Sequence, residues 1–221
     1  MWCMPMLTPE FMARMEDTLD LYARPYDPKE PVLCFDEKSK QLLKDTRSGV
    51  AMKPGKPRRR DDEYERNGVR NIFLAVEPKG GFRTVSVTRH RQKPDFARDI
   101  ERIAGLARYR HANHIHIVLD NLNTHVEKSL MATFGPDKTK RMMRRLRFHD
   151  TPKHGSWLNM AEIELSIMGR PCVNRRIPTE STLVSAAASW EQRRNSRNAT
   201  INWRFTKQLA RRIFKYRKTE I

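Results

Sequence analysis

Three acidic residues stand at positions where a metal site could form. Asp36 and Asp120 each end a short apolar run of strand length, and Glu162 lies in a segment with helical spacing. Carboxylates that gather at strand ends repel one another unless a cation joins them. Hard ions such as Mg²⁺ or Mn²⁺ take oxygen ligands, and two of them about 4 Å apart can activate the attacking oxygen and stabilise the leaving one in phosphoryl transfer. These three residues are our candidate metal ligands and catalytic residues, although a strand-end aspartate taken singly more often caps a turn.

A second glutamate, Glu164, competes with Glu162 for the role of third ligand. We predict a helix from Ser156 to about Met168, and a rotation of about 100° per residue places Glu162 on a polar stripe that also holds Asn159. Glu164 falls among apolar residues, so we expect it at the edge of a packing face, with an arginine as a natural partner. A glutamate in a pocket remains the alternative for Glu164.

The elements that must position these side chains alternate along the chain. Apolar spacing and turn residues predict helices and strands in the order helix, strand, hairpin, helix, strand, helix, strand and further helices. The expected ranges are 8–22, 32–35, 71–76 with 82–88, 95–109, 114–119, 126–134, 147–149, 156–168, 181–194 and 206–218, and the charged segment 53–66 is expected as an exposed loop. This order predicts an α/β fold with a mixed sheet flanked by helices.

Charge and composition narrow the function. Lys and Arg number 44 against 26 Asp and Glu, a surplus of +18 that is spread along the chain and favours nucleic acid as a partner over a merely soluble basic protein. No apolar run approaches the roughly 20 residues that span a bilayer, and three cysteines without CxxC spacing indicate neither a disulfide framework nor a zinc ribbon. We therefore expect a cytoplasmic protein. His114 and His116 are interpreted as strand-start residues and not as zinc ligands.

Basic residues that could contact DNA phosphates lie in three places. They are Arg58, Arg59 and Arg60 in the exposed loop, Arg144 and Arg145 before a short strand, and Lys153 in the loop 151–155. The alternative for each basic run is a solvated face without a partner.

At this point the motifs invite comparison with a family. The runs 34–38 (CFDEK), 118–125 (VLDNLNTH) and 151–166 (TPKHGSWLNMAEIELS), with RRIP at 175–178 and INWRFT at 201–206, resemble the DDE motifs of bacterial insertion-sequence transposases related to the mariner superfamily. The run TPKHGSWLNMAE is the specific one, since FDE and DN alone are weak signals. The resemblance covers nearly the whole chain.

The resemblance implies a ribonuclease-H-like fold in which Asp36, Asp120 and Glu162 bind two Mg²⁺ ions. It implies that water cleaves the transposon end and that the freed 3′-hydroxyl then attacks target DNA, commonly at a TA dinucleotide. It also implies a bacterial, nucleoid-associated protein that works as a homo-oligomer. The remaining polar residues of these motifs would orient carboxylates or DNA phosphates, or else serve as ordinary turn and cap residues: Asn121, His125, His154 and Asn159.

Two departures from the family pattern are visible. The 41 residues from 121 to 161 exceed the usual spacing of mariner-type enzymes, and the basic segment 137–147 is the expected place of the excess. Only one helix is expected before the first catalytic strand, where relatives carry a helix-turn-helix region. We therefore divide the chain into an N-terminal helix and linker (1–30), a catalytic domain (31–178) and C-terminal basic helices (179–221). A truncated DNA-binding remnant that regulates the full transposase is the main alternative, and a cellular nuclease ranks last.

Overall fold

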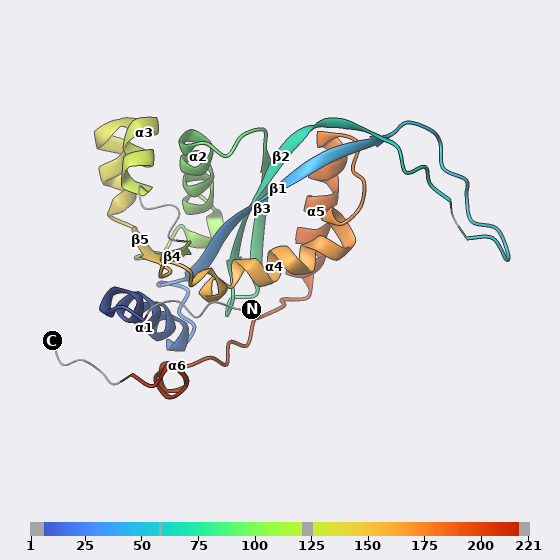
Figure 1. Cartoon of the computed structure of the whole chain (residues 1–221). Helices are drawn as coiled ribbons and strands as arrows, with labels where there is room; N and C mark the ends of the chain where they lie inside the picture. Colours follow the sequence, from blue (N-terminus) through green and yellow to red (C-terminus); the bar gives the residue numbers. More distant parts are fainter. Residues whose placement is uncertain (1–6, 58, 121–125, 217–221) are drawn as a thin grey trace.

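A five-stranded mixed sheet forms the body of the computed structural model, which describes residues 7–57, 59–120 and 126–216 (Figure 1). The strands lie in the order β3-β2-β1-β4-β5. The first three pair antiparallel, whereas β4 pairs parallel with β1 and with β5. Their bounds are β1 Val32–Asp45, β2 Tyr64–Glu77, β3 Phe82–Thr88, β4 Ile115–Leu119 and β5 Leu146–Asp150. The predicted mixed sheet is confirmed.

Helices cover both faces of the sheet. On one face α4 (Ala161–Met168) and α5 (Glu180–Ser196) lie against the strands, and on the other face lie α2 (Lys93–Ala104) and α3 (Val126–Met143) (Figure 1). Because strand side chains alternate between faces, Cys34 packs under α4 while Leu33 and Phe35 pack under α2. Two apolar layers therefore enclose the sheet.

Two further helices lie at the ends of the chain. Thr8 caps α1 (Pro9–Ala23) by accepting a hydrogen bond from the Phe11 amide at 3.1 Å, as the sequence predicts. The helix α6 (Lys207–Phe214) packs on α1, and Arg211 holds Glu16 through two bonds of 2.8 Å. The expected extra N- and C-terminal helices are thus present. Among the described residues, no helix is long and apolar enough to cross a membrane.

The strands β1 and β2 are longer than predicted. They continue past the sheet to Asp45 and from Tyr64, and form a ribbon that protrudes from the body with segment 46–63 at its tip (Figure 1). Alternation predicts only strands that bury one face, and most side chains of this continuation are polar, although Leu42 is buried in the core. At its base the Arg176 guanidinium donates to Asp45 at 2.7 Å and to carbonyls of the returning chain.

Four predicted helix boundaries need correction. The helix expected over 95–109 ends at Ala104, and the helix expected over 206–218 ends at Phe214. The helix expected to end at Phe134 resumes beyond a break at Gly135, whose φ of 76° is left-handed, and α3 runs on to Met143. The basic segment is therefore largely helical. The helix expected from Ser156 is interrupted, because Ser156–Leu158 is a short 3₁₀ turn and α4 begins only at Ala161.

Candidate active site

Strand register brings Asp36 and Asp120 together. In the parallel pair, Cys34 of β1 lies opposite Val118 of β4, and Asp36 and Asp120 follow two residues further along each strand. The period of two keeps both aspartates on the face of Cys34 and Val118, which is the face that α4 covers. The two carboxylates thus lie side by side on the inner strands β1 and β4, at the level where β4 ends, and they face the same helix. We refer to this place as the catalytic edge.

The helix α4 supplies the third carboxylate. Glu162 lies in its first turn and is exposed, whereas Glu164, two residues on, is fully buried. Glu164 accepts hydrogen bonds from Arg83 at 2.6 Å and from Arg194 at 2.6 and 3.1 Å. The expected pairing of Glu164 with an arginine is confirmed, and Glu162 is left facing the catalytic edge.

Asn159 links the two elements that carry these acids. Its side-chain amide donates to the Phe35 carbonyl at 2.9 Å, and its side-chain oxygen accepts from the Ala161 amide at 3.1 Å. Phe35 directly precedes Asp36, and Ala161 directly precedes Glu162. Asn159 has an extended backbone and is 1% exposed, so it does not lie on the helical stripe that the sequence predicts. It is a buried bridge between β1 and the start of α4.

The electrostatics show that the three acids converge. Burial raises the pKa of Asp36 to about 7; a hydrogen bond from the Glu37 amide opposes this, while the charges of Glu37, Glu162 and Asp120 add to it. Among the described residues no Lys or Arg forms an ion pair with any of the three acids. Each negative charge therefore raises the cost of ionising its neighbours, and a cation would relieve that cost.

The three acids are the right type of ligand for a hard divalent ion, but they are not close enough to one another to share one. Carboxylate oxygens are the ligands that Mg²⁺ and Mn²⁺ prefer. Within the described ranges, no three His, Cys, Asp or Glu side chains are grouped tightly enough to hold a metal ion as they stand. An ion bound by all three carboxylates would require them to move closer together.

Two residues that sequence reasoning left out border the site. Glu37 has its pKa raised mainly by burial, with the Arg91 charge opposing this and the Asp120 charge adding to it. The Thr151 hydroxyl lies 3.4 Å from Asp120 Oδ1 and is fully buried. Both lie inside the quoted motifs, directly beside or opposite a candidate ligand, and that position was the available signal.

The remaining candidate residues are spread over several parts of the fold. Lys153 and His154 are exposed in the loop that follows β5, and His154 has a left-handed φ of 63°. Arg59 is exposed on the ribbon, as is Arg60. Arg145 lies at the other end of β5 from the site and donates to the Tyr109 carbonyl at 2.5 Å; the neighbouring Arg144 is exposed. Arg58, Asn121 and His125 fall outside the described residues.

The histidines interpreted as strand-start residues belong to a hydrogen-bonded chain that the sequence did not reveal. His116 of β4 contacts Glu30 at 3.0 Å and His149 of β5 at 2.9 Å, and His149 contacts Asp17 of α1 at 2.7 Å. His114 completes the chain through Glu30 at 3.1 Å. The groups come from four separate segments, so this chain fastens α1 and the following linker to the sheet.

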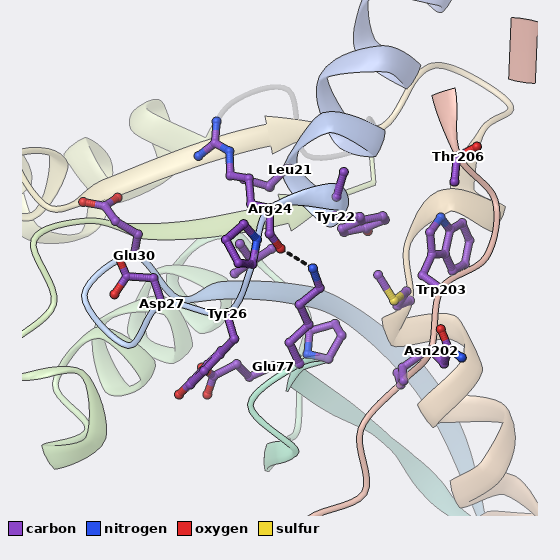
Figure 2. A pocket seen from close by; sticks show the side chains of 17 residues that line it. Leu21, Tyr22, Arg24, Tyr26, Asp27, Glu30, Glu77, Asn202, Trp203 and Thr206 are labelled. Carbon is purple, nitrogen blue, oxygen red and sulfur yellow. Dashed lines mark hydrogen bonds between the residues drawn. The ribbon is translucent and has the colours of Figure 1, made fainter. Parts of the chain in front are cut away.

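A cavity of about 400 Å³ lies between the end of α1, the linker and segment 201–206 (Figure 2). Its wall includes Tyr22 and Trp203, whose rings meet edge to face at 5.5 Å, and Figure 2 shows Glu77 at the opposite end. The Tyr22 hydroxyl donates to the Leu158 carbonyl at 2.8 Å. None of the three candidate metal ligands lines this cavity, so it is separate from the catalytic edge.

The family is settled by a comparison of the sequence with family models. The model described as DDE superfamily endonuclease matches residues 31–184. The chain belongs to this family. A comparison with curated proteins gave no significant match.

Solved structures with the same fold include complexes of the Mos1 mariner transposase. The Mos1 paired-end complex with Mn superposes with a TM-score of 0.57 at 15% identity, over 97% of this chain and 64% of that one. The Mos1 paired-end complex with left transposon end gives 0.55 at 14%, over 90% and 61%, and the strand transfer complex gives 0.53 at 12%, over 92% and 66%. The chain spans less than two thirds of these Mos1 chains. The similarity confirms the predicted ribonuclease-H-like fold.

Proposed function

We propose that this DDE endonuclease is the catalytic domain of a transposase, which cleaves transposon-end DNA and joins the freed 3′-hydroxyl to target DNA. The observation that carries the proposal is the convergence of Asp36, Asp120 and Glu162 on one sheet edge without a cationic side chain among the described residues. The Mos1 structures with this fold include a complex with a transposon end and a strand transfer complex, which supports the choice of DNA as substrate.

Asp36, Asp120 and Glu162 would hold two divalent ions, Mg²⁺ or Mn²⁺. Such ions supply Lewis acidity at the phosphorus and at the leaving oxygen. The chain's own contribution is placement: the register of β1 and β4 fixes the two aspartates, and α4 presents Glu162 to them. Asn159 keeps the start of α4 close to Phe35 through its two buried hydrogen bonds. It therefore orients both halves of the site.

The other assignments of the site residues belong to the same proposal. Asn121, His125 and His154 would orient carboxylates or DNA phosphates. Basic side chains would contact DNA phosphates, and the candidates for this role are Lys153, Arg58, Arg59, Arg60, Arg144 and Arg145. Because Arg145 already donates to the Tyr109 carbonyl, Arg144 is the stronger candidate of the two.

The proposal extends to assembly and location. We infer a homo-oligomer that brings two transposon ends together, in the bacterial cytoplasm and on the nucleoid when DNA is bound. We also retain the division into residues 1–30, 31–178 and 179–221, in which the middle segment carries all three acids. The net charge of +18 supports a polyanionic partner for the whole surface.

The test is a nicking assay on supercoiled DNA with Mg²⁺ or Mn²⁺. Asp36→Asn, Asp120→Asn and Glu162→Gln should each abolish nicking, because each removes an anionic ligand with little change in shape, while DNA binding stays largely intact. The matched control is Asp150→Asn, which removes a carboxylate from the end of the neighbouring strand β5 and should leave nicking in place.

Two outcomes would change the proposal. Nicking that survives Glu162→Gln but is lost in a folded Glu164→Gln protein would move the third ligand to Glu164. A folded wild-type chain that binds DNA but never nicks it would favour the alternative, a DNA-binding remnant that regulates the full transposase.

A further inference from the structure

A second open cavity of about 580 Å³ lies along α5, at the far end of α4 from Glu162. One wall is α5 and the other is the turn that follows α4, where Cys172 and Arg175 lie. Its lining contains two arginines, four hydroxyl side chains and no acid: Cys172, Arg175, Ser181, Thr182, Ser185, Ala186, Ser189 and Arg193. We refer to it as the α5 groove.

Two guanidiniums converge on the α5 groove without a carboxylate between them. Arg175 and Arg193 are exposed, and neither forms an ion pair with another described residue. Both guanidiniums line one cavity with Cys172, and their charges oppose the rise that burial causes in the pKa of the Cys172 thiol. Several arginines elsewhere hold acids, as Arg176 holds Asp45 and Arg211 holds Glu16, whereas the two groove arginines share a cavity with hydroxyl donors. An anion fits this set of donors.

The hydroxyl groups of the groove are arranged along α5. Ser181, Ser185, Ser189 and Arg193 recur every four residues along α5, and all four line the groove. The twelve-residue interval covers about 18 Å of helix axis, which is longer than one phosphate group and allows contacts to several successive phosphates of one strand. A row of hydroxyl donors that ends in a guanidinium suits a chain of phosphates better than a single one.

The position of Arg175 is fixed before any ligand arrives. The Lys40 ammonium, from β1, donates to the Arg175 carbonyl at 2.9 Å and also to the carbonyl of Val173. This bond holds the turn beside α5 and adds a third positive charge close to the groove. Less reordering is then needed when a polyanion binds.

We infer that the α5 groove is a DNA-binding site that holds the phosphate backbone of a duplex through Arg175, Arg193 and the serine hydroxyls, away from the catalytic carboxylates. It recognises backbone and not base sequence, since guanidinium and hydroxyl donors facing phosphates carry no base information. The inference rests on the proposed function only in naming DNA as the polyanion. DNA that the catalytic edge cuts would be steadied along α5 at the other end of α4.

The experiment measures salt dependence in the full chain with Glu162→Gln, which prevents cleavage of the probe. Binding of a fluorescent duplex is followed by anisotropy over a range of NaCl concentrations, with and without Arg175→Gln and Arg193→Gln together. Each lost phosphate contact should reduce the slope of log K against log salt by about one, so the double variant should lose about two. At about 100 mM salt its affinity should fall about tenfold or more.

The matched control removes the same charge elsewhere. Arg98→Gln with Arg212→Gln takes two exposed guanidiniums from α2 and α6, outside the groove, and should change the slope by much less. Equal slope changes in the two double variants would overturn the inference, because only net charge would then matter. Binding of inorganic phosphate that is lost in the groove variant, with an unchanged DNA slope, would overturn it in favour of a small-anion site.

The outcome is separable from that of the proposed function. Failure of the groove leaves the nicking assay of the acid variants unaffected, whereas a wild-type chain that never nicks can still show the slope change. Ser185→Ala with Ser189→Ala is a milder variant that keeps the charge. It should weaken duplex binding severalfold with the slope nearly unchanged, and unaltered affinity would remove the hydroxyl row from the site.

Discussion

Two glutamates of α4, separated by one residue, have opposite surroundings. Glu164 is fully buried, and its two oxygens are held by Arg83 and Arg194. Glu162 is exposed and faces Asp36, and among the described residues no arginine or lysine forms an ion pair with it. Both glutamates lie on the same helix, so the difference arises from the side chains that other elements place beside each of them. An acid whose charge is already neutralised by guanidiniums serves structure, and an acid left with other acids is available to a cation.

The largest expected effect concerns stability. Glu164→Ala leaves the buried Arg83 without its carboxylate, and Arg83 already has two buried nitrogens without a partner in the described structure. The free energy of unfolding should fall by about 3–5 kcal/mol, against less than about 0.5 kcal/mol for Glu162→Ala at the exposed position. Chemical denaturation of the two variants measures the difference. Equal losses would show that the two environments are not distinct in solution.

The next effect is the response of the catalytic edge to pH. Asp36 has its pKa raised to about 7 from an ordinary 3.8, so the folded protein binds a proton that the unfolded chain has released. Without metal, stability should therefore fall as pH rises from about 4 to 7, and Asp36→Asn should flatten that slope. Thermal unfolding at a series of pH values measures it. Added Mn²⁺ should raise the melting temperature most above pH 7, where no proton competes for Asp36, and an unchanged melting temperature in Mn²⁺ would speak against the metal site.

The histidine chain should respond to pH in the opposite direction. A hydrogen bond from His149 lowers the pKa of Asp17, burial lowers the pKa of His116, and the pKa of Glu30 is lowered by its two histidines although burial opposes this. The charge of Arg24 also lowers the pKa of both Asp17 and His116. The charges of Arg14 and His149 act on the neighbouring Asp150.

Each of these groups prefers its less protonated form in the folded state. The stability that His116 contributes is present above pH 6.5, the ordinary pKa of histidine, and is lost as pH falls through its lowered pKa. The contributions of Asp17 and Glu30 are present above their ordinary pKa values of 3.8 and 4.5 and are lost only at lower pH. His116→Gln should reduce the loss below pH 6.5, and hydrogen exchange of α1 should locate it. Protection of α1 that does not change with pH in the wild type would contradict the role of this chain.

The smallest expected effect concerns an ion pair that is partly exposed. Arg211 and Glu16 repeat the chemistry of the Glu164 pair with two bonds of 2.8 Å, but both side chains are partly exposed. Water screens such a pair, so Arg211→Gln should lower the free energy of unfolding far less than Glu164→Ala does. A cost as large as that of Glu164→Ala would mean that burial is not what separates the two pairs.

Local pattern was enough to predict most of the elements and the edge at which the acids meet. The apolar run before Asp120 correctly predicts the end of a strand, and helical phase within α4 separates Glu162 from Glu164. The strand end predicted at Asp36 is wrong, because β1 continues to Asp45. The role of Asn159 was beyond such reasoning, since its bond to Phe35 spans 124 residues of sequence. The ribbon was missed because most of its side chains are polar and Leu42 alone does not make an alternating pattern. The pairs of Glu164 with Arg83 and Arg194 depend on contacts 81 and 30 residues apart, so the sequence could suggest an arginine but not which one.

The central position of β1 has a consequence for the order in which the molecule folds. Its pairing with β2 closes a short stretch of chain, whereas its pairing with β4 joins residues about 84 positions apart, from Val32 to His116. Short loops close sooner than long ones, so we expect the β1–β2–β3 meander to form early and β4 to dock later. Asp36 then stays solvated until β4 docks and places Asp120 beside it. The two aspartates are therefore brought together late, when the rest of the core can hold them.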